Sequence, residues 1–404
     1  MKNLSSGIEF IVGIPSYMER DSISFVTKQA DLGLTKYFSN FKSIIINADN
    51  NSEDDTREAF LSTKTKTPKR YITTPKGIRG KGNNLLNIFR FAKKHARTLK
   101  GVVVVDADLR SITPEWIKYL GEPILKGYDF VLPIYSRHQF DGTITNHICY
   151  PLIYGLLGEN FRQPIGGETA FSPALMNYWL DQKWDSTTRH YGIDIFMTLH
   201  SIFGNFRICE AGLGAKIHKA SSPKLGPMFT QVVTTLFEII LSRESSWIKT
   251  TVLKPESKKR FGLKRLVPSQ ELKINICELK EKLRAEYHPK ETLLKKYLND
   301  YAATNLETMF EQDVYNIDTF MWTQILYQLL FWYRNGSVKV RKDIVEALKP
   351  LYFARSVTFD YQTWRYSVKY VEDAILEQAK AFASQKPYFL GLYLIAEKKK
   401  RARK

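Results

Sequence analysis

The chain has 404 residues, of which 44% are hydrophobic and 13% aromatic, a composition that indicates a globular protein and excludes a disordered one. Its formal net charge of +19 favours anionic partners: nucleotide phosphates, acidic metabolites, nucleic acid or an anionic membrane surface. Three widely spaced cysteines, Cys149, Cys209 and Cys277, form neither a zinc pattern nor a disulfide framework, which indicates a reducing compartment such as the cytoplasm.

Predicted strands and helices alternate along the first third of the chain. Short apolar runs that end in turn residues predict strands over residues 10–15, 43–49, 71–74, 102–105 and 130–134. Helical spacing and capping residues predict helices over residues 20–34, from about 54, and over 83–99. This alternation predicts an α/β fold with a parallel sheet and helices on both faces. No Gly-x-Gly-x-x-Gly follows the first strand, which excludes a dehydrogenase-type Rossmann domain.

Long charged or aromatic-rich helical stretches dominate beyond about residue 249. The predicted helices cover residues 270–287, 291–301, 319–333, 338–353 and 366–382. We expect a catalytic domain over 1–249 with halves at about 8–135 and 136–249, a helical region over 250–397, and a basic tail over 398–404. Such tails are usually solvated ends, and no recognisable module supports a nucleic-acid partner.

The chain enters a strand almost at its N-terminus and shows no signal-peptide pattern. No segment offers about 18 uncharged apolar residues, so we expect no integral membrane segment.

The most informative stretch is Val102-Val103-Val104-Val105-Asp106-Ala107-Asp108. The β-branched run is typical of a buried strand in a parallel sheet, and ligands of open α/β sheets lie beyond the carboxyl ends of the strands. Asp106 and Asp108 repel each other there unless a cation joins them, and carboxylate oxygens suit Mg²⁺ or Mn²⁺ bridging a diphosphate. The alternative is a strand that ends in a solvated acidic turn.

Two loops of the first half suggest nucleotide recognition. The first strand runs into Ser16-Tyr17-Met18-Glu19, where Glu19 either accepts hydrogen bonds from a nucleoside or favours the following helix N-terminus. Asp49, at the end of the second strand, offers the same chemistry. Residues 77–82 form a basic glycine-rich loop whose amides and Lys81 suit a phosphate, although the spacing is not that of a Walker loop.

Three later features complete an ordered series. Gly166 and Gly167 are adjacent, which indicates either close backbone approach to a ligand or a tight turn. Asp194, in Tyr-Gly-Ile-Asp, opens a predicted helix. His218 is either structural or completes a metal site with Asp108, because imidazole is the commonest transition-metal ligand.

In this order the motifs resemble those of GT-A-fold nucleotide-sugar glycosyltransferases, over residues 8–240. Within that fold the chain looks like the glucosyl-3-phosphoglycerate synthases and the mannosylglycerate and glucosylglycerate synthases. The matching parts are Asp106-Ala107-Asp108, Gln163-Pro164-Ile165-Gly166-Gly167, Tyr191-Gly192-Ile193-Asp194, His218, Gly80-Lys81-Gly82 and Tyr135-Ser136-Arg137.

The resemblance implies a GT-A catalytic domain, retention of anomeric configuration, a UDP- or GDP-sugar donor and a divalent metal, Mg²⁺ or Mn²⁺. The implied donor-binding residues are Pro15, Tyr17, Glu19, Asp49, Lys81, Asp106 and Ala107. The implied acceptor-binding residues are Arg137, Gly166, Gly167, Thr169 and Asp194. Asp108 and His218 would bind the metal, and Asp106, Asp194 and Lys81 would carry the chemistry.

The expected acceptor is a small hydroxy acid, 3-phosphoglycerate or D-glycerate. Glu168 follows the two glycines, at a position where a basic residue would hold the phosphate of an acceptor, and this favours unphosphorylated glycerate as the acceptor. The residues that could hold an acceptor phosphate instead are Lys219, Ser221, Ser222 and Lys224. The helical region is expected to build a homodimer interface or to cover the acceptor site. The alternatives are a glycosyltransferase acting on a lipid phosphate at a membrane surface and a non-catalytic, basic binding protein.

Overall fold

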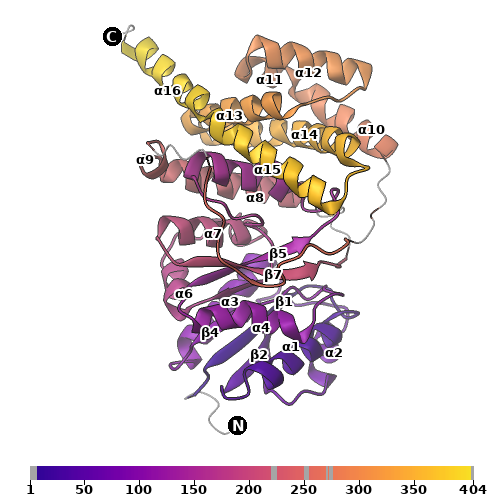
Figure 1. Ribbon diagram of the computed structural model, residues 1–404, viewed down its shortest axis with the longest axis vertical. Helices are drawn as coiled ribbons and strands as arrows, with labels where there is room; N and C mark the ends of the chain where they lie inside the picture. The colour runs from indigo at the N-terminus through magenta and orange to yellow at the C-terminus, as the bar shows by residue number, and fades with distance from the viewer. Residues whose placement is uncertain (1–6, 220–224, 250–253, 270–271, 273–275, 402–404) are drawn as a thin grey trace. The chain divides into compact units, whose positions relative to one another are not determined.

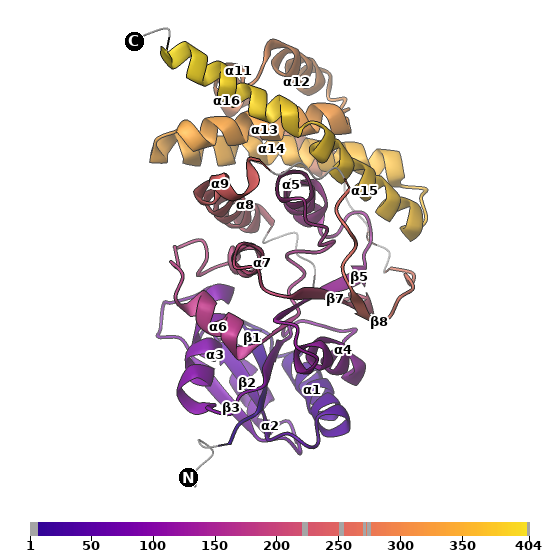
Figure 2. The same cartoon turned by 60° about the vertical axis from the view of Figure 1, so that its left-hand side comes forward.

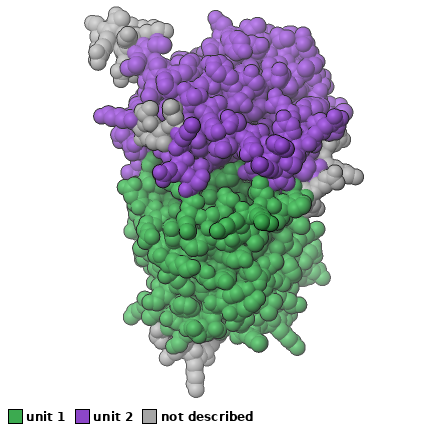
Figure 3. All heavy atoms as spheres, viewed as in Figure 1, with its two compact units in different colours: residues 1–136, 162–235, 258–270 green, residues 137–161, 236–257, 271–404 purple. Residues whose placement is uncertain are grey.

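The computed structural model describes residues 7–219, 225–249, 254–269, 272 and 276–401. The chain divides into two compact units, coloured separately in Figure 3. Unit 1 comprises residues 1–136, 162–235 and 258–270, and unit 2 comprises residues 137–161, 236–257 and 271–404. The division does not coincide with the expected boundary at residue 249, because residues 137–161 group with the C-terminal helices and residues 258–270 with the sheet.

Unit 1 contains a mixed eight-stranded sheet in the order β3-β2-β1-β4-β6-β5-β7-β8 (Figure 1). The strands are β1 (Phe10–Ser16), β2 (Ser43–Asp49), β3 (Lys69–Thr73), β4 (Gly101–Val104), β5 (Phe130–Ser136), β6 (Thr169–Phe171), β7 (Ile208–Ala215) and β8 (Arg260–Gly262). Only the short β6 runs antiparallel to its neighbours β4 and β5. The carboxyl ends of the other seven strands therefore meet at one edge, as expected for a mostly parallel sheet.

Helices cover both faces of this sheet (Figure 2). They are α1 (Ile23–Tyr37), α2 (Thr56–Ser62), α3 (Lys81–His95), α4 (Pro114–Leu125), α6 (Pro173–Leu180) and α7 (Ile193–Phe203), and α8 (Leu225–Ser242) begins in this unit. On one face, apolar residues of α1 and α4 pack with Phe10, Val12 and Val103 in a fully buried core. On the other face, Phe89 of α3 packs against Phe171 and Trp179.

Unit 2 is helical. Its α-helices are α5 (Tyr150–Leu152), α9 (Glu244–Trp247), α10 (Ile276–Tyr287), α11 (Glu291–Tyr297), α12 (Asp300–Gln312), α13 (Thr319–Asn335), α14 (Val338–Thr363), α15 (Val368–Ser384) and α16 (Lys386–Arg401). Single π-helical turns, η1 (Thr145–Cys149) and η2 (Ile153–Leu157), flank α5, and a 3₁₀ turn, η4 (His288–Lys290), follows α10. The helix α16 extends through the first residues of the basic tail, and residues 402–404 lie outside the described residues.

Within the described ranges, α8 alone is long and apolar enough to cross a membrane by length and composition. It has 18 residues and a mean hydropathy of 1.4, and 44% of it is buried inside the protein. A core helix passes the same test, so this finding is weak evidence for a membrane span. The expectation concerned uncharged segments, and α8 did not meet that criterion because Glu238 lies within it.

Candidate active site

The acidic side chains predicted from the Asp-x-Asp motif lie at the carboxyl edge of the sheet. Val105 follows β4 directly and donates its amide to Gly13 of β1, so the turn that carries Asp106 and Asp108 begins beside the end of β1. The Asp106 side chain is 22% exposed. Carboxylates in such a partly buried position need charge partners, and the structure supplies them from distant parts of the chain.

Lys81 joins two of these carboxylates. Its Nζ lies 2.9 Å from Asp106 Oδ1 and 3.1 Å from Asp194 Oδ2. Burial favours the neutral amine, but the attraction of Asp106 and Asp194 outweighs it and raises the pKa of Lys81 above its ordinary value. Burial likewise raises the pKa of Asp194, whereas for Asp106 the two neighbouring lysines overcome burial and hold the pKa well below its usual range. The three residues expected to carry the chemistry are thus brought together.

The glycine loop achieves this meeting by close backbone packing. A Cβ on Gly82 would lie 2.0 Å from the Thr188 carbonyl oxygen, and one on Gly80 would lie 2.3 Å from the Arg189 carbonyl oxygen. The segment that precedes Asp194 therefore rests directly on the start of α3, which carries Lys81 in its first turn.

The expectation that this loop offers its backbone amides to a phosphate needs correction at Gly80 and Gly82, and the amide of Asn83, directly after the loop, is engaged as well. The amide of Gly80 donates to Asn50 Oδ1 at 2.7 Å, that of Gly82 to the His190 carbonyl at 3.1 Å, and that of Asn83 to the Arg189 carbonyl at 2.9 Å. These donors are engaged within the protein because the glycines serve helix–loop packing.

Lys216, which sequence reasoning missed, is the second cation of the cluster. Its Nζ lies 2.8 Å from Glu168 Oε2, 3.0 Å from the Gly166 carbonyl oxygen and 3.4 Å from Asp106 Oδ2. Lys216 directly follows β7, so the strand-end rule that identified Asp106 would have found it had β7 been recognised.

Glu168 is fully buried between Lys216 and the hydroxyl of Tyr135, which donates a hydrogen bond to it. Burial raises the pKa of this carboxyl, against the attraction of Lys216. Because its charge is paired inside the protein, Glu168 does not present a free negative charge to an acceptor. The reason for disfavouring a phosphorylated acceptor is removed.

The adjacent glycines approach the acidic cluster closely. Gly167 has a φ of +98°, and a Cβ there would lie 2.5 Å from Asp106 Oδ2. A Cβ on Gly166 would lie 2.1 Å from Pro133 Cγ. Thr169 begins β6 and is buried, and its Oγ1 has no hydrogen-bond partner among the described residues. Close approach of the backbone to the Asp106 carboxylate thus explains Gly167, and packing against β5 explains Gly166.

The loop after β1 is tied to the residues that follow β7. Glu19 is buried and pairs with Lys219, with 2.7 Å between Oε2 and Nζ. Burial raises the pKa of Glu19, and the negative charge of Asp108 acts in the same direction. Tyr17, in the loop after β1, lies under the guanidinium of Arg79 from the glycine loop, 4.7 Å from its ring centre, and Pro15 is buried in β1.

Asp49 is fully buried and serves the fold at this edge. Its carboxylate accepts hydrogen bonds from the Ser16 hydroxyl at 2.6 Å, the Ser52 amide and hydroxyl at 2.6 and 2.8 Å, and the Tyr71 hydroxyl at 2.9 Å. These bonds fix the ends of β1, β2 and β3 relative to one another.

Asp108 and His218, the residues expected to bind a metal, lie in two segments that hydrogen bonds join. The Ile217 amide donates to Ser111 Oγ at 2.9 Å and its carbonyl accepts from the Arg110 amide at 2.8 Å, which ties the segment before His218 to the turn after Asp108. Within the described part of the chain, no group of three or more histidine, cysteine, aspartate or glutamate side chains is placed to hold a metal ion. Two protein ligands fit Mg²⁺ or Mn²⁺ when substrate phosphates and waters supply the remainder.

The other expected residues lie as follows. Ala107 is buried between the two aspartates. Arg137 is the first residue of unit 2 and pairs with Asp141 at 3.1 Å in that unit. Ser221, Ser222 and Lys224 lie outside the described residues.

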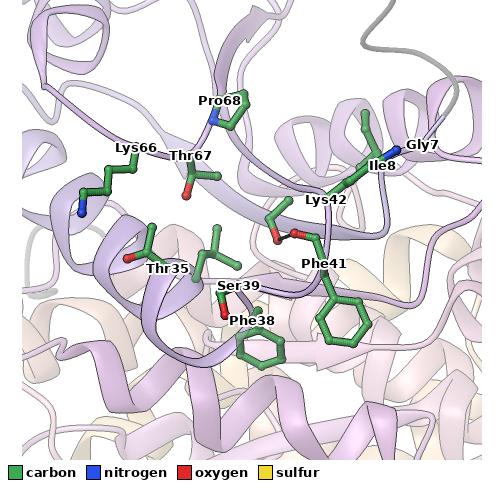
Figure 4. Close-up of a pocket in the computed structure, with 12 residues that line it drawn as sticks. Gly7, Ile8, Thr35, Phe38, Ser39, Phe41, Lys42, Lys66, Thr67 and Pro68 are labelled. Atoms are coloured by element: carbon green, nitrogen blue, oxygen red, sulfur yellow. Dashed lines mark hydrogen bonds between the residues drawn. The ribbon is translucent and has the colours of Figure 1, made fainter.

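A pocket of about 480 Å³ lies at the opposite, amino-terminal edge of the sheet (Figure 4). It is bordered by the end of α1, including Thr35 and Phe38, by Lys42 before β2, and by Lys66 and Pro68 before β3. None of the expected site residues lines it. We assign the candidate active site to the carboxyl edge because the paired charges gather there.

Comparison with known proteins agrees with this architecture. Residues 11–182 match the model of the family described as glycosyl transferase family 2. The match spans β1 to α6 and includes Lys81, Asp106, Asp108 and the adjacent glycines, but ends before Asp194 and His218. No match was found among curated proteins.

Similar solved structures include three of glucosyl-3-phosphoglycerate synthase from Mycobacterium tuberculosis. The complex with Mg²⁺ and UDP is 24% identical with a TM-score of 0.47, and that with phosphoglyceric acid is 25% identical with a TM-score of 0.47. The complex with Mn²⁺, UDP-glucose and phosphoglyceric acid is 25% identical with a TM-score of 0.46. Each similarity covers 58% of this chain and 80% of the other.

Proposed function

We infer that the chain is a glycosyltransferase, because residues 11–182 match the model of glycosyl transferase family 2 and lie in a mixed, mostly parallel sheet of the GT-A fold. We propose that it transfers glucose or mannose from a UDP- or GDP-sugar to 3-phosphoglycerate or D-glycerate, with retention of anomeric configuration. The observation that carries the proposal is the cluster of Lys81, Asp106 and Asp194 at the carboxyl edge of the sheet.

One carboxylate oxygen of the cluster accepts no hydrogen bond from the described residues. Asp194 Oδ2 pairs with Lys81, whereas Asp194 Oδ1 is buried and has no hydrogen-bond partner among the described residues. An unsatisfied buried carboxylate oxygen is costly, so a hydroxyl that donates to it is favoured. A hydroxyl of the transferred sugar or of the acceptor supplies that donor in our proposal.

Charge distribution supports departure of a nucleoside diphosphate. Breaking the bond between the sugar and the diphosphate increases negative charge on the β-phosphate and positive character on the sugar. Lys81 and Lys216 provide fixed cations close to this centre, and Asp106 provides a carboxylate between them. Tyr17 and Glu19, in the loop after β1, remain our candidates for the nucleoside, with Pro15, Asp49 and Ala107 shaping the surrounding backbone.

Asp108 and His218 are the proposed protein ligands of Mg²⁺ or Mn²⁺. A divalent cation there would act as a Lewis acid on the diphosphate. Replacing either residue with alanine should abolish transfer and weaken binding of Mn²⁺ in the presence of UDP, measured by electron paramagnetic resonance. Unchanged Mn²⁺ binding in both variants would contradict the assignment.

The acceptor residues of the proposal are Gly166, Gly167, Thr169, Asp194 and Arg137. Arg137 suits a carboxylate or phosphate because a charge-assisted hydrogen bond to either is strong. Arg137→Ala should therefore lower kcat/KM for the acceptor far more than it changes donor affinity. Equal effects on both substrates would remove Arg137 from the acceptor site.

A matrix of donors and acceptors tests the function itself. UDP-glucose, GDP-glucose and GDP-mannose are each paired with D-glycerate and 3-phosphoglycerate at millimolar concentration, and the anomeric configuration of any product is read by NMR. Transfer to either acid with retention supports the proposal. Transfer only to a lipid phosphate or a neutral saccharide would contradict the acceptor assignment while leaving the glycosyltransferase domain in place.

Location and assembly are part of the proposal. A cytoplasmic enzyme agrees with the three cysteines, of which Cys149 and Cys209 are buried and all are free. A homodimer built through residues 250–397 is tested by light scattering of the purified chain.

A further inference from the structure

An exposed group of aromatic and basic side chains marks the turn between α14 and α15 in unit 2. Tyr361, Trp364, Tyr366 and Tyr370 are 53%, 63%, 50% and 62% exposed within a ten-residue stretch. Arg365 and Lys369 are also exposed there. We call these six residues the aromatic corner. Single exposed apolar residues are ordinary, but four large exposed aromatic rings within ten residues are typical of an interaction surface.

The aromatic corner is held by a well-packed base. Phe359 and Val371, which flank it, are buried in the cluster formed by α14, α15 and the segment around Tyr150. Thr363 is buried and donates its hydroxyl to the Phe359 carbonyl at 2.7 Å. The Tyr366 amide donates to the Thr363 carbonyl at 2.8 Å and so fixes the turn. The rings therefore point outward from an ordered turn.

The chemistry of the corner fits the interface of a lipid bilayer. Each of its rings is tryptophan or tyrosine, the residues that concentrate at membrane–water interfaces because one end is apolar and the other polar. The guanidinium of Arg365 lies 4.6 Å from the centre of the Trp364 ring, and the Tyr366 and Tyr370 rings meet edge to face at 6.1 Å. Two pairs among the six side chains are thus in contact, one cation with a ring and one ring with a ring.

Charge distinguishes the partner. Residues 361–370 carry two basic and no acidic side chains, while the acid before them, Asp360, is buried. Two acids follow shortly after Tyr370: Glu372, which is partly exposed, and Asp373, which is exposed. A net charge of +19 adds long-range attraction to an anionic surface.

We propose that the aromatic corner docks the protein peripherally on an anionic phospholipid membrane, with its rings at the level of the headgroups. This inference does not depend on the proposed sugar-transfer reaction. Docking would hold the enzyme at the bilayer through residues that are not part of its candidate active site.

Co-sedimentation with phospholipid vesicles tests the proposal. The full chain is mixed with vesicles of phosphatidylcholine alone or of phosphatidylcholine and phosphatidylglycerol in equal amounts. Binding to the anionic vesicles, and much weaker binding to the neutral ones, is expected. No binding of the full chain to anionic vesicles would overturn the proposal.

Three sets of substitutions locate the contact. Replacing Trp364, Tyr366 and Tyr370 together with alanine should lower vesicle partitioning more than tenfold. Replacing Arg365 and Lys369 with glutamine should lower it about fivefold per residue at low salt, since each basic residue near such a surface contributes about 1 kcal/mol. The matched control, Tyr301→Ala with Phe320→Ala, removes rings that are 57% and 55% exposed elsewhere in unit 2 and should bind as the full chain does.

Further arms separate docking at the corner from other causes. Circular dichroism and thermal unfolding confirm that each variant is folded, and Trp364→Phe should retain most of the binding. Vesicle binding that survives the triple substitution, or that is lost only when residues 398–404 are deleted, would overturn the proposal. The same holds if the corner substitutions abolish binding to a single-stranded oligonucleotide while vesicle binding is unchanged.

Discussion

One ammonium group shared between two carboxylates defines the candidate site at the residue scale. Without Lys81, the carboxylates of Asp106 and Asp194 would face each other across a partly buried space with Lys216 as the remaining close cation. Like charges in such a position raise each other's pKa and repel a substrate diphosphate. Lys81 therefore holds the acids in place, and in our proposal it also supplies positive charge where a leaving group needs it.

Replacing Lys81 with methionine, which keeps the length of the side chain, should lower kcat/KM by about 100-fold to 1000-fold, because a preorganised charge at the reacting centre is lost. The matched control is Lys36→Met, which breaks an exposed ion pair with Glu115 of similar length, 3.1 Å. Exposed pairs contribute less than about 1 kcal/mol, so the control should retain stability and activity. Steady-state kinetics of the two variants test this prediction. If Lys81→Met were as active as Lys36→Met, Lys81 would have no part in the chemistry.

Gly167 tests whether the close approach of its loop to Asp106 matters. Gly167→Ala combines a positive φ with a Cβ 2.5 Å from Asp106 Oδ2, so it should lower activity at least tenfold and destabilise the fold by roughly 1–3 kcal/mol.

Two alanine controls separate strain from contact. Gly77 also has a positive φ but no neighbour within 4 Å, and Gly226 has neither constraint. Gly77→Ala should lose stability alone, and Gly226→Ala should lose nothing. If Gly167→Ala and Gly77→Ala behave alike in activity assays, the contact with Asp106 is unimportant.

The residues that sequence predicted and those it missed differ in a physical way. Asp106, Lys81 and Asp194 stand in short motifs whose chemistry is local, and the structure brings them together. Lys216 belongs to no sequence motif. It joins the site only because hydrogen bonds between Ile217, after β7, and the turn after β4 bring the two segments together. Tertiary packing of this kind has no local signature.

Strands with strong local patterns were predictable at the scale of elements. The predicted bounds of β2 equal the observed ones, and the observed β1 and β5 are one and two residues longer than predicted. β6, β7 and β8 were missed because β6 and β8 have three residues each and β7 contains two glycines, two alanines and a glutamate. The helices α13 and α15 agree closely with prediction, since their apolar periodicity is long.

The glutamate of β7 makes the stability of unit 1 depend on pH. Burial raises the pKa of Glu210 from 4.5 to about 7, although it accepts the Arg162 amide at 2.9 Å. An acid whose pKa is raised on folding stabilises the native state fully below its unfolded pKa and loses that contribution as pH rises through the folded pKa. The loss falls between about pH 4.5 and 7 and amounts to about 3 kcal/mol.

Glu210→Gln should remove this dependence. Between pH 5 and pH 8 the original chain should therefore lose unfolding free energy relative to the variant. Urea denaturation at both pH values measures it. Glu115 is the control of opposite sign, because hydrogen bonds from Tyr37 and Lys36 lower its pKa to about 2. Its glutamine variant should not gain stability as pH rises, and a pH-independent difference for Glu210→Gln would contradict the assignment.

Charge and division into units are properties of the whole molecule that sequence captures unequally. The net charge of +19 is read directly from composition. The assignment of residues 137–161 to unit 2 was not predictable, because their π-helical turns pack with helices more than 150 residues later, as Trp322 does by donating to the His147 carbonyl at 2.7 Å. Such long-range packing sets the unit boundary.

The basic tail separates long-range charge from chemistry at the site. Residues 398–404 contain six of the basic side chains that make the chain so positive. Deleting them should leave kcat for a small acceptor within about twofold, because screening over roughly 8 Å at physiological salt limits what remote charges contribute to a partly buried centre. At low salt the deletion should lower kcat/KM modestly, since the attraction of anionic substrates weakens. Assays of the truncated and full chains across ionic strength distinguish the two effects; a large loss of kcat at physiological salt would instead show that the tail takes part in catalysis.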